Sequence, residues 1–259
     1  MVGQIFLALI LAGIIGAVGG YLGSLMLTKR MALMGGALGH LTLPGVALAL
    51  LYDFDVSLGA VLFLALGVAM IWYLERKTRL HLEALTAVVF SGSLAVAFLF
   101  LPEEETDIAL LGDISRITPA TVFSTAAISL GLFWMIKSIY EDLILAGISP
   151  DLAQTAGADL KRNNTLYLIC IAITVALGVR IVGGLMTAAL LAIPACTAKN
   201  LSTSLGQYAL ISTLAGCLAC LAGILVYAAS DIPPGPAIII ASVILFLVSV
   251  FKPFALSFH

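Results

Sequence analysis

A single histidine stands inside one of the longest apolar stretches of the chain. Residues 31–50, MALMGGALGHLTLPGVALAL, contain no charged side chain, and His40 is their one ionisable group. An ionisable residue at membrane depth is costly, so it normally faces a cavity or a partner and marks a pathway. Imidazole is a suitable ligand for zinc, iron and related divalent metals. His40 therefore favours metal transport, with a histidine bonded to a neighbouring helix as the alternative.

Pro44, four residues after the histidine, strengthens this interpretation. Proline has no N–H, so a helix that contains it leaves the carbonyl four residues earlier without its helical hydrogen bond. Here that carbonyl belongs to His40, and the residue would present an imidazole nitrogen and an unpaired oxygen at one height. Transporters build cation sites from such unwound backbone near the membrane midplane.

The composition indicates the elements that must position these groups. The chain has 259 residues, of which 62% are hydrophobic and only 10% are charged. A soluble domain is nearer half apolar and a quarter charged. The apolar residues form blocks close to the roughly 20 residues that a helix needs to cross a bilayer. We therefore expect one all-α transmembrane domain over residues 1–259, a polytopic helical bundle. Its nine apolar segments are 5–28, 31–52, 57–74, 84–102, 119–139, 164–182, 183–199, 206–229 and 234–251.

The basic residues predict the orientation of the spans, because cytoplasmic loops are enriched in Lys and Arg. With an external N-terminus and nine spans, only Arg116 and Arg180 lie outside. The cytoplasmic set is Lys29, Arg30, Arg76, Lys77, Arg79, Lys137, Lys161, Arg162, Lys199 and Lys252. A re-entrant 183–199 segment would give eight spans and a weaker asymmetry. Nine is favoured, and eight stays open.

Acidic residues gather in the predicted external loops. They are Asp53, Asp55, Glu103, Glu104, Glu105, Asp107, Asp113 and Asp231. An acidic vestibule raises the local cation concentration, although sorting of basic residues to the inside would leave the same pattern. Asp231 precedes the last span in SDIPPGPAIII, where it can cap the helix and also lie at the extracellular end of a cation path.

The one long cytoplasmic connection that we predict covers about residues 140–164. Ser149 is placed to cap a short helix with Pro150 at its first position and Asp151 in its first turn. An exposed amphipathic helix suits the docking of a partner protein, and an ordinary linker is the alternative.

Other chemistries lack their residues. There is no HExxH or GxSxG motif, and no glycine-rich loop ending in GK[ST] that could hold ATP phosphates. The cysteines at 170, 196, 217 and 220 lack the paired CxxC spacing of a zinc site and fit helix packing. The net charge of −2, without a basic run, argues against nucleic-acid binding.

Five motifs, in order, make the chain resemble the permease subunits of zinc, manganese and iron ABC importers, the metal ABC-3 family. They are ALGHLTLPGVAL (37–48), LLGDI (110–114), SPDLAQTAG (149–157), RIVGGLMTAALLAIPACTA (180–198) and SDIPPGPAIII (230–240). The resemblance implies a homodimer in the cytoplasmic (inner) membrane, with a central path between its subunits. It also implies two cytoplasmic ATPase subunits that bind the ATP, and an external metal-binding protein.

The resemblance also assigns roles to residues. His40 and Asp231 would line the path, and Asp113 would belong to the external vestibule or gate. The segment Ser149–Gly157, with Pro150, Asp151 and Leu152, would be the coupling element that docks on the ATPase. No permanently bound cofactor is implied, since the divalent metal is the transported substrate.

Gly36 departs from the family pattern, in which an aspartate stands one turn before the histidine. A carboxylate and an imidazole at i and i+4 share a helix face and could hold one ion. Without that carboxylate, the identity of the metal stays open, and import of a chelated metal becomes a reasonable alternative. A stand-alone secondary cation transporter is less favoured, because the spans carry few charges. An intramembrane enzyme is disfavoured, because His40 has no evident charged partner within the spans.

Overall fold

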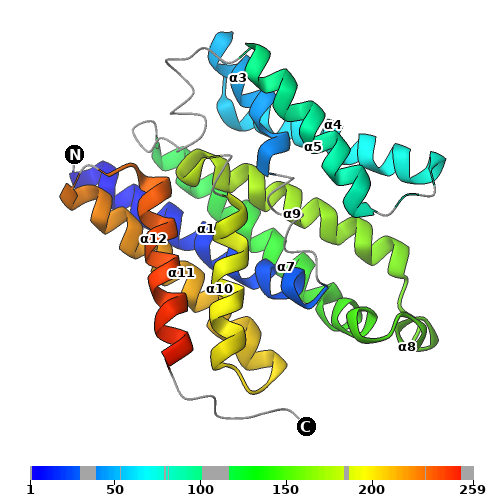
Figure 1. The fold of residues 1–259 in the computed structure, drawn as a ribbon. Helices are drawn as coiled ribbons and strands as arrows, with labels where there is room; N and C mark the ends of the chain where they lie inside the picture. The colour runs from blue at the N-terminus through cyan, green and yellow to red at the C-terminus, as the bar shows by residue number, and fades with distance from the viewer. Residues whose placement is uncertain are drawn as a thin grey trace.

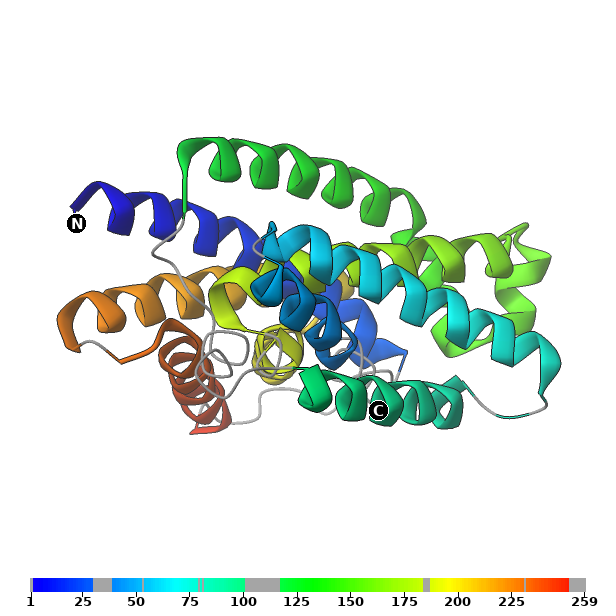
Figure 2. The same cartoon turned by 90° about the horizontal axis from the view of Figure 1, so that it is seen from above.

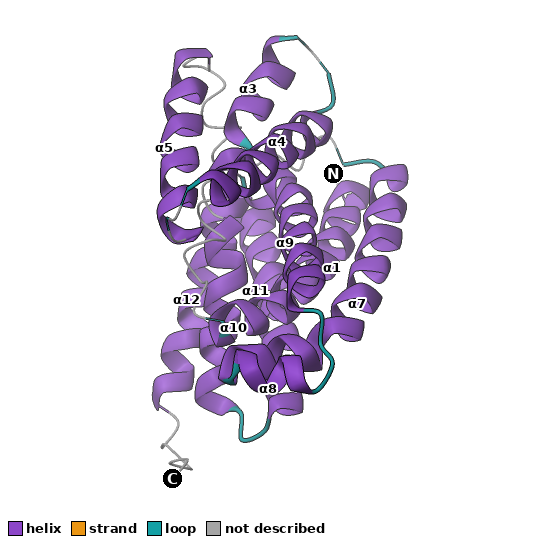
Figure 3. Cartoon of the chain, turned by 90° about the vertical axis from the view of Figure 1, so that its right-hand side faces the viewer, coloured by secondary structure: helices purple, strands orange, loops and turns teal. Residues whose placement is uncertain are grey.

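The computed structural model describes residues 2–29, 39–52, 54–78, 80, 82–100, 117–183, 187–230 and 232–251. Within these ranges the regular structure is helical and there is no strand (Figure 3). The helices are α1 (Val2–Thr28), α3 (Leu43–Leu51), α4 (Val56–Lys77), α5 (Leu82–Phe100), α7 (Pro119–Ile148), α8 (Pro150–Thr155), α9 (Leu160–Val182), α10 (Thr187–Leu201), α11 (Leu205–Ser230) and α12 (Pro234–Phe251).

Within the described ranges each predicted apolar segment overlaps a helix, although residues 31–38 of the 31–52 segment lie outside those ranges. Two of the differences in bounds affect the predicted 140–164 connection. α7 continues nine residues beyond the predicted end at 139, and α9 begins at Leu160, before the predicted start at 164. The predicted 140–164 connection is therefore largely helical. The end of α7 is polar enough to look like a loop, yet it buries Leu143 and Ile144, and this buried face continues the helix.

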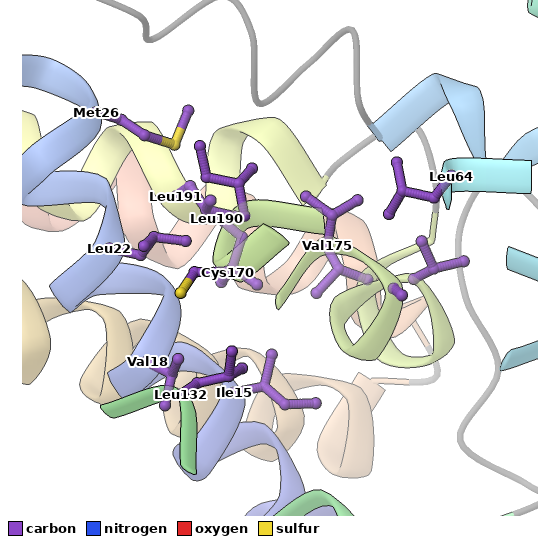
Figure 4. Packing of buried hydrophobic residues seen from close by; sticks show 14 of the residues in the cluster. Ile15, Val18, Leu22, Met26, Leu64, Leu132, Cys170, Val175, Leu190 and Leu191 are labelled. Atoms are coloured by element: carbon purple, nitrogen blue, oxygen red, sulfur yellow. The ribbon is translucent and has the colours of Figure 1, made fainter. Parts of the chain in front are cut away.

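The helix α1 is the central element of the larger group of helices, where it packs against α7, α9, α10 and α11 (Figure 1). Its buried residues Leu22 and Met26 lie close to Leu190 and Leu191 of α10 (Figure 4). Glycine and alanine are frequent on α1, and they bring its backbone close to its neighbours. This helix therefore fixes the relative positions of the others.

Glycines make the contact between α1 and α11 unusually close. A methyl group added at Gly16 would overlap the backbone carbonyl of Gly216, and one at Gly20 would overlap that of Ser212. The Ser212 hydroxyl donates a hydrogen bond of 2.5 Å to the Gly20 carbonyl oxygen. Small residues four apart let membrane helices approach in this way. Here the Gly16 and Gly20 spacing serves packing within the chain.

The helices α3, α4 and α5 form a second group beside α9 (Figure 1). Gly45 of α3 and Gly59 of α4 face each other, and a methyl group at either would overlap the other's carbonyl oxygen. α5 and α7 lie on opposite sides of the molecule (Figure 2).

Many large apolar side chains are exposed on the outer surface of the bundle. Leu62 and Leu66 on α4, Leu218 on α11 and Val248 on α12 are all more than half exposed. Within the described part of the chain, five helices are long and apolar enough to cross a membrane: Gly3–Thr28, Pro119–Ile148, Arg162–Val179, Leu205–Ser230 and Pro234–Phe251. Leu58–Leu74 and Ala84–Ala97 are shorter apolar helices. A multi-pass membrane protein accounts for both observations, because lipid is the solvent for such a surface.

Candidate functional site

The helix that carries His40 is interrupted two residues after it. Residues 39–41 are helical, Thr42 is a turn residue, and α3 begins at Leu43 with Pro44 in its first turn. The Gly39 carbonyl accepts hydrogen bonds from the Thr42 hydroxyl at 2.6 Å and from the Thr42 N–H at 3.3 Å. Pro44 has no N–H to offer the carbonyl of His40. The helix is thus interrupted just before Pro44, while the role of Pro44 beside a cation site stays a prediction.

The interruption is held between two helices of the second group. Leu41 is buried and packs on Gly67 of α4, where an added methyl group would lie 2.8 Å from the leucine Cδ1. The His40 ring lies on the other side, with its centroid 4.9 Å from that of Phe90 on α5 and the rings inclined by 50°. These two successive side chains therefore contact different helices, Leu41 contacting α4 and His40 contacting α5.

The His40 imidazole has an unused nitrogen. The residue is half-buried, and its Nδ1 is enclosed without a hydrogen-bond partner among the residues described. A buried polar atom without a partner is destabilising, so such atoms call for an explanation. The alternative of a histidine bonded to a neighbouring helix through this nitrogen is not what the described contacts show. Phe90 was not foreseen, because no sequence pattern pairs α5 with the histidine.

Asp231, predicted for the path, and Asp113, predicted for the external vestibule or gate, lie outside the described residues, so their roles stay predictions. Gly36 lies outside them as well. Among the residues that are described, no group of three or more His, Cys, Asp or Glu side chains comes together.

The cysteines pack between helices, as the sequence suggested. Their thiols are free, and Cys170 and Cys220 are buried. A methyl group added at Gly13 of α1 would lie 3.6 Å from Sγ of Cys217. Cys217 and Cys220 therefore fill space between α1 and α11.

The predicted coupling element contains the expected short helix, α8. Ser149 has extended backbone angles (φ −151°, ψ 109°), and its hydroxyl accepts a hydrogen bond of 3.4 Å from the Leu152 N–H. Pro150 starts the helix and Asp151 lies in its first turn. Leu152 is 58% exposed, which leaves an apolar side chain available to a partner. Gly157 ends the element with φ 87°, a conformation that favours glycine.

The sequence matches the ABC 3 transport family over residues 1–253. It is 29% identical over 248 residues to the manganese import system permease protein ScaB of Streptococcus parasanguinis, covering 94% of this chain and 89% of that protein. It is 28% identical over 260 residues to the high-affinity zinc uptake system membrane protein ZnuB of Haemophilus influenzae, covering 96% and 97%.

The fold has solved counterparts. The structure of PsaBC from Streptococcus pneumoniae in complex with Fab contains a chain that aligns with a TM-score of 0.82 at 25% sequence identity, covering 95% of this chain and 90% of that one. The chain belongs to the ABC 3 transport family. It is the membrane-spanning transport subunit of an ABC transporter, with ATP hydrolysis assigned to a separate subunit. The family resemblance stated from the sequence is therefore confirmed.

Proposed function

We propose that the chain is the permease subunit of an ATP-driven importer for a free divalent transition metal, with manganese or zinc as cargo. The observation that carries this proposal is the enclosed Nδ1 of His40 at a helix break, which has no hydrogen-bond partner among the described residues. The two relatives above are named for manganese import and zinc uptake, which supports these metals. Iron stays a prediction from the sequence alone. Import of a chelated metal is the alternative.

The proposed path combines His40 with Asp231, and it places Asp113 at the external vestibule or gate. Carboxylate oxygens suit manganese, and imidazole suits zinc. Since Gly36 supplies no side chain, Asp231 would provide the negative charge of the path. A stand-alone secondary transporter would need its own driving-ion site, and family membership argues against it.

The proposed assembly is a homodimer in the cytoplasmic (inner) membrane, with two ATPase subunits that bind ATP and an external metal-binding protein. The short helix α8, with its exposed Leu152, suits docking on the ATPase. Movement of the ATPase would then shift the permease between inward-facing and outward-facing states.

Helix directions support nine spans. α1 runs antiparallel to α11, because Gly16 faces Gly216 and Gly20 faces Ser212. It runs parallel to α10, since Gly19 lies near Leu190 and Gly23 near Leu191 and Ala195. A re-entrant α10 would return the chain to the side it came from, and α11 would then run parallel to α1.

Uptake of radioactive manganese and zinc into proteoliposomes tests the function. The vesicles contain the permease, its ATPase and its binding protein. His40→Ala is expected to lower uptake by about tenfold or more, as the loss of a metal ligand does. Phe90→Leu is the packing control, because it alters the contact with the ring and keeps the imidazole. Normal uptake by His40→Ala, in a complex that assembles, would remove the histidine from the path. Accumulation of chelated metal alone would favour the alternative cargo.

A further inference from the structure

Three helix ends meet where α8 joins the bundle: the C-terminus of α1, the last turns of α7 and the first turn of α9 (Figure 1). α8 packs on α7 and α9, and its Ala153 is completely buried. The chain is non-helical on both sides of α8, with extended Ser149 before it and Gly157 at positive φ after it. Such points absorb rotation easily, so the backbone alone is a poor transmitter of a push on α8.

One side-chain contact joins the two helices that flank α8. The Asn163 amide of α9 donates a hydrogen bond of 2.8 Å to the Asp142 carboxylate of α7. Asn163 has no exposed surface, and its Oδ1 finds no partner within the described part of the chain. Burying an amide whose oxygen has no hydrogen-bond partner costs free energy. A hydrogen bond to a charged group is among the stronger ones, and it offsets part of that cost.

A second contact joins α1 to the same turn of α9. The Lys29 ammonium donates a hydrogen bond to Oδ1 of Asn164 and lies 5.2 Å from the ring centroid of Tyr167. A methyl group added at Gly147, near the end of α7, would lie 3.9 Å from Cγ of Lys29. Burial lowers the pKa of Lys29, so the hydrogen bond and the aromatic face replace part of the hydration that the ammonium has lost.

We propose that Lys29, Asp142, Asn163 and Asn164 form a coupling clamp that holds α1, α7 and α9 together, so that movement of α8, which packs on α7 and α9, shifts all three helices. These are positioning residues, since none of them touches the cargo or ATP. The inference rests on the proposed docking of the ATPase at α8. Without the clamp, a displacement of α8 would separate α7, α9 and α1 from one another instead of moving the three helices together.

The test measures ATP hydrolysed per metal ion imported, in proteoliposomes that contain the complete complex and manganese or zinc. Asp142→Ala is expected to raise this ratio about tenfold, the effect of losing one charge-assisted hydrogen bond, while the ATPase still co-purifies. Asp142→Asn keeps an acceptor for the Asn163 amide and is expected to restore most of the coupling. A merely structural role would lower hydrolysis and uptake together and leave the ratio unchanged.

Asn200→Ala is the matched control, because Asn200 also donates an interhelical hydrogen bond, of 2.9 Å to the Ser249 hydroxyl, away from α8. Its ratio is expected to equal that of the unmodified permease. If Asp142→Ala does not assemble, Lys29→Gln tests the clamp through its other contact, again by a raised ratio.

Charge reversal in α8, Asp151→Lys, separates this inference from the proposed function. Asp151→Lys can raise the ratio of ATP hydrolysed to metal imported while Asp142→Ala and Lys29→Gln leave it normal. That result would overturn the clamp and keep the docking site at α8. A normal ratio in Asp151→Lys, with the ATPase still bound, would reject docking at α8 and the clamp with it.

Discussion

The contact between α1 and α11 allows a quantitative prediction at Gly20. In Gly20→Ala, the new methyl group would overlap the carbonyl oxygen of Ser212 and lie 2.8 Å from its carbonyl carbon. Both neighbours are backbone atoms, so no side-chain rotation relieves the overlap. The two helices must separate, and the hydrogen bond from the Ser212 hydroxyl to the Gly20 carbonyl is weakened as they do.

The expected cost follows from these two effects. Overpacking in a well-packed core costs about 1–3 kcal/mol. An interhelical hydrogen bond in a membrane contributes about 0.6 kcal/mol. Alanine recovers about 0.5–1 kcal/mol through its better helix propensity. The net loss is about 1–3 kcal/mol, which corresponds to a melting temperature lower by about 3–10 °C for a chain of this size.

Thermal unfolding of the purified permease in detergent measures this loss. Gly131→Ala is the matched control, because Gly131 also lies inside a helix, α7, and an added methyl group would meet nothing within 4 Å. The control is expected to melt at the same temperature as the unmodified chain or slightly above it. Equal melting temperatures for Gly20→Ala and Gly131→Ala would refute the close contact between α1 and α11.

Two further predictions concern the ends of α8. Gly157→Ala forces alanine into a φ of 87°, which costs about 1–2 kcal/mol, so we expect a melting temperature lower by a few degrees; Gly147→Ala, with ordinary contacts from 3.7 Å, is its control. Ser149→Ala removes the cap of α8 at a cost of about 1 kcal/mol. It is expected to speed amide hydrogen exchange in residues 151–155 without changing exchange in α12, and unchanged exchange throughout would contradict the cap.

Most of the fold could be predicted from hydropathy, because each membrane helix must satisfy its own backbone hydrogen bonds. That requirement made the segments 206–229 and 234–251 agree closely with α11 and α12. The end of α7 could not be predicted in this way, because Glu141 faces outward and Asp142 bonds to another helix while Leu143 faces inward. Hydropathy averages over the two faces and misses the difference.

Part of the candidate site was also visible in the sequence. His40 and Pro44 stood out because a histidine and a proline are rare in an otherwise apolar span. The capping residues of α8 could be predicted from the adjacent sequence, since a cap bonds to a backbone N–H only three residues away. Phe90 and the pair Asp142–Asn163 depend on tertiary packing. Asn163 lies in a polar run that suggests a solvent-exposed loop, and only the fold shows it buried.

The length of α7 has a mechanical consequence. Its 30 residues span about 45 Å at 1.5 Å per residue, whereas the hydrocarbon core is about 30 Å thick. Its one proline stands at the first position, so the helix can behave as a stiff lever pivoting inside the bilayer. A tilt of about 10° around its midpoint would displace the end that carries α8 by about 4 Å. A small tilt of α7 would thus convert a displacement of α8 at the membrane surface into a change in the angle between α7 and the helices that it packs against.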